Sequence, residues 1–223
     1  MNKDLTEVVF IIDESGSMHG LEGDTVGGFN STVDKQKKLG GECLVSTVMF
    51  NTRSRVIHDR VNIRDIKEMT SADYCPSGST ALIDALGDSI RHIKMVHRYI
   101  REEDVPSKTM FVITTDGMEN ASRKYSLSEV KKMIEERKEK GWEFVFLAAN
   151  IDAAETARSY GIDADSCVDY VNDAEGNAIK YACMSEAITS VRTSRKLNKG
   201  WKKKSEEDFK NRGKTSYYSP ISK

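Results

Sequence analysis

Hydrophobic and polar positions follow two alternating periods along this chain. Short apolar runs, typical of buried strands in a parallel sheet, occur at residues 8–12, 44–50, 109–114, 144–148 and 167–171. Between these runs, apolar residues recur every three or four positions, as they do on one face of a helix. Strands that alternate with helices along a chain predict a parallel sheet that is covered by helices on both faces.

The helical segments are bounded by recognisable signals. Helices are expected over about residues 24–39 and 81–97, from residue 126 onward, and over 152–160 and 179–191. A glycine pair follows the first of them, as glycines often do at the end of a helix. Ser126 and Glu129 have the spacing of a capping box, which marks the start of the third helix.

One strand departs from the parallel pattern. Residues 53–61 resemble a strand and follow the run at 44–50 after a turn of only two residues. So short a connection allows only antiparallel pairing, which places this strand at an edge. The predicted fold is therefore an α/β, doubly wound, mostly parallel central sheet of about six strands, with one antiparallel edge strand and helices on both faces, as in Rossmann-like proteins.

Charge is distributed unevenly along the 223 residues. The net charge is only −1, but from Arg195 to the end there are ten Lys or Arg residues and three Asp or Glu residues. The body of the chain is therefore acidic and its end is basic. We expect one domain over residues 1–195, which can bury a substantial core, and a flexible basic tail over residues 196–223.

Neither a signal peptide nor a membrane-spanning segment is visible in the sequence. The first seven residues are largely polar, and no apolar run approaches the roughly 18 residues that span a bilayer. The four cysteines have no paired or metal-type spacing, which indicates reduced thiols. We therefore expect a cytoplasmic monomer that has no membrane partner.

Oxygen-bearing side chains are concentrated in three segments: after two of the predicted strands and in the loop before one of the helices. Asp13, Ser15 and Ser17 alternate directly after the first apolar run, and Asp116 follows the run at 109–114. Thr80 ends a hydroxyl-rich loop that leads into the amphipathic helix at 81–97. Doubly wound sheets bind ligands outside the carboxyl ends of their strands, so these five side chains are expected to converge at one edge.

Two carboxylates and three hydroxyls suit a small, hard cation. A calcium cage uses six to eight oxygen ligands, whereas Mg²⁺ and Mn²⁺ accept octahedral oxygen coordination and retain water. The predicted cofactor is therefore Mg²⁺, with Mn²⁺ as an alternative. Two negative charges around a dication leave it electrophilic, so an open coordination position would attract a carboxylate from outside.

The Asp13-x-Ser15-x-Ser17 motif, the helix-preceding Thr80 and the Asp116-Gly117 pair together resemble the von Willebrand factor type A (VWA) domain and its metal ion-dependent adhesion site (MIDAS). The alternation of elements fits this family from about residue 5 to residue 195. Residues 25–30 and Gln36 are similar to its cytosolic bacterial and phage branch. The sequence departs from the family pattern at Ser79, where a glycine is common.

The resemblance implies a role for each candidate ligand. Ser15, Ser17 and Thr80 would coordinate the ion directly, Asp13 and Asp116 would act largely through bound water, and Thr80 or Asp116 would exchange roles between states. It also implies a non-enzymatic adaptor whose protein partner supplies an Asp or Glu to the metal. In cytosolic relatives the partners include AAA+ ATPases and other assemblies.

Two other functions remain open at this point. A metal-dependent phosphoester hydrolase could use Asp13 as its nucleophile, although Ser15 stands where such enzymes place a second carboxylate. A nucleic-acid-associated protein could bind through its tail, which contains Trp201, the lysines at 202–204 and the tyrosine pair at 217–218. The second alternative can coexist with metal binding.

Overall fold

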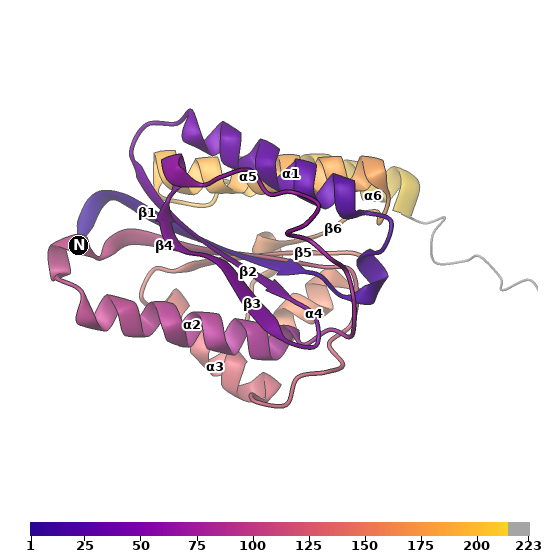
Figure 1. Cartoon of the computed structure of the whole chain (residues 1–223), viewed down its shortest axis with the longest axis horizontal. Helices are drawn as coiled ribbons and strands as arrows, with labels where there is room; N and C mark the ends of the chain where they lie inside the picture. The colour runs from indigo at the N-terminus through magenta and orange to yellow at the C-terminus, as the bar shows by residue number, and fades with distance from the viewer. Residues whose placement is uncertain (214–223) are drawn as a thin grey trace, which may run out of the picture.

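The computed structural model describes residues 1–213, whose centre is a six-stranded sheet in the order β3-β2-β1-β4-β5-β6 (Figure 1). The strands are β1 (Asn2–Asp13), β2 (Glu42–Phe50), β3 (Ser54–Asn62), β4 (Pro106–Thr115), β5 (Glu143–Ala148) and β6 (Cys167–Asp169). All neighbouring strands pair in parallel except β2 and β3, which form the antiparallel edge. The predicted fold class is therefore confirmed.

Helices cover both faces of the sheet (Figure 1). One layer contains α1 (Glu22–Lys37), α5 (Ala174–Ser194) and α6 (Lys203–Arg212). The other layer contains α2 (Leu82–Tyr99), α3 (Leu127–Lys138) and α4 (Ala153–Ser159). The expected capping box is present at α3, where Ser126 and Glu129 each bond the other's backbone N–H.

The alternation of side chains along β1 builds a separate core on each face of the sheet. Val8, Phe10 and Ile12 pack in the cluster formed with α1 and α5, whereas Val9 and Ile11 pack in the cluster formed with α2, α3 and α4. All five side chains are at most 2% exposed. Successive residues of a strand point to opposite faces, so a strand buried on both faces is apolar throughout, as the sequence pattern predicted.

The direction of winding reverses between β1 and β4. From β1 the chain continues to β2 on one side, and it later returns to β4 on the other side, from which β5 and β6 follow outward. The register pairs Ile12 of β1 with Thr114 of β4, so the two strands end side by side. A topological switch point of this kind leaves room for a ligand beyond the strand ends.

The segment of α1 that suggested the cytosolic branch has a structural role. Asn30 donates to the Met69 carbonyl and accepts from the Met69 amide, which fixes the connection that follows β3. Gln36 is 1% exposed, donates to the Ser185 carbonyl and the Thr189 hydroxyl, and accepts from Arg192. These polar contacts hold α1 against α5.

The expected flexible tail is in fact partly folded. Residues Lys199–Lys202 form a 3₁₀ turn, and α6 follows it directly. Trp201 is 2% exposed and packs in the core cluster of α1 and α5, and its indole N–H donates to the Asp165 carbonyl at 3.1 Å. The charge pattern suggested solvation, but the burial of one large aromatic side chain anchors the segment. The remainder of the expected tail, residues 214–223, lies outside the described residues.

Within residues 1–213, no helix combines the length and the apolar character that crossing a membrane requires.

Truncation of the anchoring tryptophan should destabilise the whole domain. We expect Trp201→Ala to lower the free energy of unfolding by about 3–5 kcal/mol, because it removes a buried aromatic side chain and leaves a cavity. Lys203→Ala, at the exposed start of α6, should change it by at most about 0.5 kcal/mol. Urea unfolding measures both values, and a loss below 1 kcal/mol for Trp201→Ala would mean that this segment is only loosely attached.

Candidate metal centre

The loop that follows β1 is organised around the Asp13 carboxylate. Its Oδ1 accepts a hydrogen bond from the Ser15 backbone N–H at 2.8 Å, and its Oδ2 accepts one from the Thr115 hydroxyl at 2.6 Å. Asp13 is therefore fixed to its own loop and to the tip of the neighbouring strand β4. The carboxylate is 1% exposed.

Hydroxyl groups link this loop to the second carboxylate. The Ser15 and Ser17 hydroxyl oxygens lie 3.0 Å apart, and the Ser17 hydroxyl donates to Asp116 Oδ1 at 2.6 Å. The other Asp116 oxygen, Oδ2, accepts from the Asn172 amide group at 3.3 Å. Asp116 directly follows β4, so residues 99 positions apart in the chain meet at the switch point of the sheet.

Backbone hydrogen bonds bring the loop before α2 to the same place. The Ser77 N–H donates to the Glu14 carbonyl at 2.9 Å, and the Gly16 N–H donates to the Gly78 carbonyl at 3.0 Å. Gly78 has a φ of +70°, and a Cβ there would lie 2.6 Å from the Thr52 hydroxyl oxygen, so only glycine fits this turn. The tight turn of this loop is therefore made by Gly78, one residue before Ser79, where the family commonly has a glycine.

The loop ends at Thr80, whose hydroxyl lies on the site. A Cβ built on Gly117 would be 3.9 Å from the Thr80 hydroxyl oxygen and 3.8 Å from that of Ser17, so the two hydroxyls flank the same residue. The Thr80 N–H donates to the Asn120 side chain, and its carbonyl accepts from the N–H groups of Asn120 and Ala121. The structure thus brings together all five side chains that the sequence singled out.

The two carboxylates of the site differ from the other buried carboxylates in their ion pairs. Among residues 1–213, four carboxylates are buried, and two of them have cationic partners: Glu7 pairs with Arg60 and His97, and Glu14 pairs with Arg55. Within residues 1–213, no ion pair forms with Asp13 or Asp116. Unpaired buried charge is costly, so these two carboxylates lack the compensation that the other two have.

The pKa of Asp13 is raised, first because the carboxyl is buried and also because the Asp116 charge lies nearby. The buried Asn172 side-chain oxygen also has no hydrogen-bond partner among the described residues, although its amide group contacts Asp116. A hydrated dication would compensate both carboxylates and place water near this oxygen. The donor set therefore fits Mg²⁺ or Mn²⁺.

Metal ligation by these five residues stays a prediction. Across the described part of the chain, no three His, Cys, Asp or Glu side chains are grouped as a metal centre. A cation at the switch point would therefore depend on hydroxyl and water ligands in addition to Asp13 and Asp116. Ser17 is exposed and the other four residues are buried, so it marks the side from which an ion or a partner would arrive.

The sequence did not reveal the residues that support the strand tips. Tyr74 donates from its hydroxyl to the Asp13 carbonyl at 2.6 Å, and Tyr170 donates to the Thr115 carbonyl at 3.3 Å. Both tyrosines are 1% exposed. Tyr74 lies in a loop-like segment and Tyr170 lies near the end of a short apolar run, and neither has a spacing that signals its role, which becomes visible only once the chain is folded.

Glu119 lies in the loop after Asp116 and supports the start of α2. In the structure, its carboxylate accepts from the backbone N–H of Ile83 at 2.8 Å and from the N–H groups of Ala121 and Ser122 at 2.9 and 2.8 Å. It therefore satisfies a free donor at the start of α2 and ties the loop after Asp116 to that helix.

An apolar groove of about 540 Å³ opens beside the site. Gly117, which lies beside the Ser17 and Thr80 hydroxyls, also lines this groove together with Leu82, Met118 and Ile151. Met118 is 73% exposed. The site and an apolar surface are thus adjacent on the same edge of the sheet.

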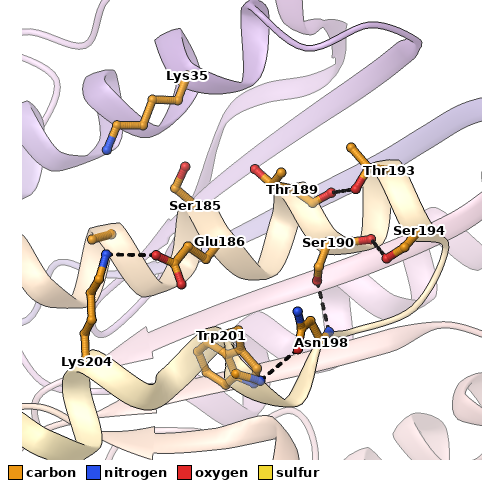
Figure 2. A pocket seen from close by; sticks show the side chains of 12 residues that line it. Lys35, Ser185, Glu186, Thr189, Ser190, Thr193, Ser194, Asn198, Trp201 and Lys204 are labelled. Atoms are coloured by element: carbon orange, nitrogen blue, oxygen red, sulfur yellow. Dashed lines mark hydrogen bonds and ion pairs between the residues drawn. The ribbon is translucent and has the colours of Figure 1, made fainter.

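A second groove lies between α1, α5 and the segment that contains Trp201 (Figure 2). Its many hydroxyls are already bonded to the protein: Ser190, Thr193 and Ser194 donate to carbonyls of the preceding helical turn. Lys204 forms an ion pair with Glu186, as Figure 2 shows. This polar groove is a product of helix packing and offers few unused groups for a ligand.

The basic residues near the end of the described chain are also largely paired internally. Lys202 donates to the carbonyls of Ala164 and Cys167, and Arg212 forms ion pairs with Asp173 and Asp208. Trp201 is buried and is not available for stacking on bases. The expected tyrosine pair at 217–218 lies outside the described residues.

Solved structures with a similar fold include several VWA domains. The von Willebrand factor type A protein from Catenulispora acidiphila is 16% identical (TM-score 0.56), and the match covers 83% of this chain and 42% of that one. The VWA domain of the pilus tip protein Mfa5 from Porphyromonas gingivalis is 10% identical (TM-score 0.60), with coverages of 89% and 99%. Manganese-loaded TRAP from Plasmodium vivax is 12% identical (TM-score 0.53), with coverages of 81% and 73%.

These similarities show that the chain has the VWA fold. The chain spans less than half the length of the Catenulispora protein, and all three identities are at most 16%. No protein-family model matches the sequence, and no curated protein is detectably similar to it. The resemblance that the motifs suggested is thus confirmed at the level of the fold, from comparison of structures.

Neutralising Asp13 should stabilise the protein when metal is absent. Because burial raises the pKa of Asp13, its ionised form is less favourable in the folded chain than in the unfolded chain, so this charge lowers stability at neutral pH. We expect Asp13→Asn to raise Tm in EDTA by about 2–4 °C, while Asp4→Asn at an exposed position leaves it unchanged. The effect of the charge should shrink as the pH is lowered and Asp13 is protonated in the unaltered protein. A Tm difference between the two proteins that does not change with pH would come from the hydrogen bonds that Asn cannot accept and would show that the carboxylate is not under electrostatic stress.

Proposed function

We propose that this protein is a non-enzymatic binding module that holds Mg²⁺ or Mn²⁺ at Asp13, Ser15, Ser17, Thr80 and Asp116 and captures a protein partner through an acidic residue of that partner. The observation that carries the proposal is the pair of buried carboxylates without ion pairs, which lies among three hydroxyls at the switch point. Two carboxylates do not fill the octahedral coordination of a divalent ion, so the carboxylate of a partner would be a favourable further ligand.

The residues present suit the metal roles that the resemblance implies. Ser15, Ser17 and Thr80 offer neutral oxygens for direct ligation, while both oxygens of Asp13 already accept hydrogen bonds and would act through water. The manganese-loaded TRAP structure supports a divalent ion in a protein of the same fold. When bound, the metal would supply an electrophilic position for the oxygen of an acidic side chain.

The adjacent groove defines a second part of the proposed contact. A partner that places Asp or Glu on the metal would also cover Met118 and Leu127, two exposed apolar side chains that line the groove. We therefore propose that an apolar side chain of the partner lies next to its acidic residue. Burial of that side chain would add affinity that the metal alone does not give.

The hydrolase alternative is less well supported. A nucleophilic Asp13 would need an accessible oxygen, but its carboxylate is 1% exposed and both oxygens accept hydrogen bonds. The nucleic-acid alternative loses Trp201 and several basic side chains to internal contacts. The nucleic-acid alternative also does not explain why five oxygen-bearing side chains converge.

The cellular setting remains part of the proposal. A cytoplasmic location, a monomeric state and a partner among AAA+ ATPases or other assemblies follow from the sequence features and the family resemblance. Capture from cell extract in Mg²⁺, followed by elution with EDTA, would identify the partner directly.

Removal of two hydroxyl ligands should weaken metal binding. We expect the double substitution of Ser15 and Ser17 by alanine to weaken Mg²⁺ and Mn²⁺ binding by at least about tenfold, or about 1.4 kcal/mol, in isothermal titration calorimetry. The same variant should capture no partner from cell extract that EDTA elutes. Ser31→Ala, on the exposed side of α1, is the matched control and should behave like the unaltered protein. Equal metal affinity in the double variant would refute the ligand set.

Loss of the apolar contact should separate partner binding from metal binding. Met118→Ser should reduce capture of the EDTA-eluted partner about tenfold while Mg²⁺ affinity is unchanged, because Met118 contributes surface and no ligand. Val56→Ser removes a similarly exposed apolar side chain, which is 61% exposed on the edge strand β3, and should have no effect. Undiminished capture by Met118→Ser would exclude the groove from the interface.

A further inference from the structure

Lys180 is a buried lysine beneath the candidate metal centre. It lies on α5 and is 1% exposed, although lysine is rarely buried without a charged partner. Its ammonium group donates to the Asn177 side-chain oxygen at 2.5 Å and lies 4.6 and 4.7 Å from the ring centroids of Tyr170 and Tyr181. Among residues 1–213, no carboxylate forms an ion pair with it.

The cage around Lys180 shares a wall with the metal centre. The Tyr170 ring contacts the ammonium group on one side, and the Tyr170 hydroxyl donates to the carbonyl of Thr115, the residue before Asp116. Tyr170 therefore connects the ammonium group to the strand tip that precedes Asp116, one of the two buried carboxylates without an ion pair. Cation–π contacts hold a cation in place without neutralising it, so its field extends to neighbouring groups.

The charged groups that act on Lys180 come from three elements. Asp116 follows β4, Asp13 ends β1, and Asp24 lies on α1; each of these carboxylates favours the protonated ammonium group. Burial acts in the opposite direction and is the larger effect, so the pKa of Lys180 is lowered to about 7. The ionisable side chains in direct contact with the ammonium group are Tyr170 and Tyr181. Burial raises the pKa of both tyrosines, so they stay neutral.

Two of the three carboxylates that stabilise the Lys180 charge are those proposed to hold the dication. By reciprocity, the ammonium group stabilises Asp13 and Asp116 when no metal is present and repels a cation that arrives there. A dication at the site would compensate the same charges more strongly, and the two cations would compete.

We propose that Lys180 is the internal counter-cation of the metal centre: it compensates Asp13 and Asp116 in the metal-free protein and lowers the affinity of the site for a divalent ion. This inference rests on the proposed metal site. Lys180 would act on the metal only through the two carboxylates: it would set how readily the ion exchanges without contacting the ion. A site kept stable without metal in this way can load and release the ion without unfolding its loops.

The direct test replaces Lys180 with a neutral side chain of similar length. Lys180→Met should bind Mg²⁺ at least about tenfold more tightly than the unaltered protein in isothermal titration calorimetry, at a pH below the Lys180 pKa of about 7. Lys35→Met removes the same charge from an exposed position on α1 and should change the affinity by less than about twofold. Equal or weaker Mg²⁺ binding by Lys180→Met would overturn the proposal. If that variant does not fold, Lys180→Gln carries the same expectation.

A second measurement examines the metal-free protein. In EDTA, a double-mutant cycle between Lys180→Met and Asp116→Asn should show favourable coupling: Lys180→Met should lower Tm more when Asp116 is intact than when it is neutral. Absence of coupling would contradict a counter-cation role. If the unaltered protein binds neither Mg²⁺ nor Mn²⁺, the proposed metal site fails and the predicted effect on metal affinity fails with it. The cycle would still decide whether Lys180 compensates the carboxylates.

Discussion

The candidate site depends on how two buried carboxylates are stabilised at the point where the sheet reverses its winding. Asp13 and Asp116 follow adjacent strands, are each 1% exposed, and have no ion pairs within residues 1–213. The surrounding loops are arranged for them: Thr115, Ser15 and Ser17 donate to their oxygens, and two buried tyrosines fix the strand tips. Hydrogen bonds reduce the cost of burying such charges but do not neutralise them, so the site is suited to a cation.

The requirements of the fold and of the site are separable. The apolar strands and the two helical layers need only hydrophobic burial, and structures at most 16% identical reach the same arrangement. The carboxylates, hydroxyls and tight turn at Gly78 add nothing to the core, yet they fix three distant segments within hydrogen-bond distance of one another. Polar groups that converge in this way at a strand edge are explained by a ligand more readily than by stability.

The sequence predicted the strands, the antiparallel edge and the five converging side chains, because short apolar runs and strand-end motifs are local signals. It was wrong about residues 199–212, where the basic composition concealed the burial of Trp201. It also missed Lys180, although Lys180 falls on the same helical stripe as Cys183, Ala187 and Val191, where a charged residue is out of place. Tyr74 and Tyr170 could not be found at all, since their role depends on tertiary contacts between segments far apart in the chain.

The most direct test of the central idea is the position of a bound ion in solution. Paramagnetic Mn²⁺, added in small amounts to isotopically labelled protein, broadens the NMR signals of nuclei close to it. We predict that the amide signals of Ser15, Ser17, Thr80 and Gly117 disappear first and return when excess Mg²⁺ displaces the Mn²⁺. Broadening that begins elsewhere, or that Mg²⁺ does not reverse, would show that the five converging side chains do not form the metal centre.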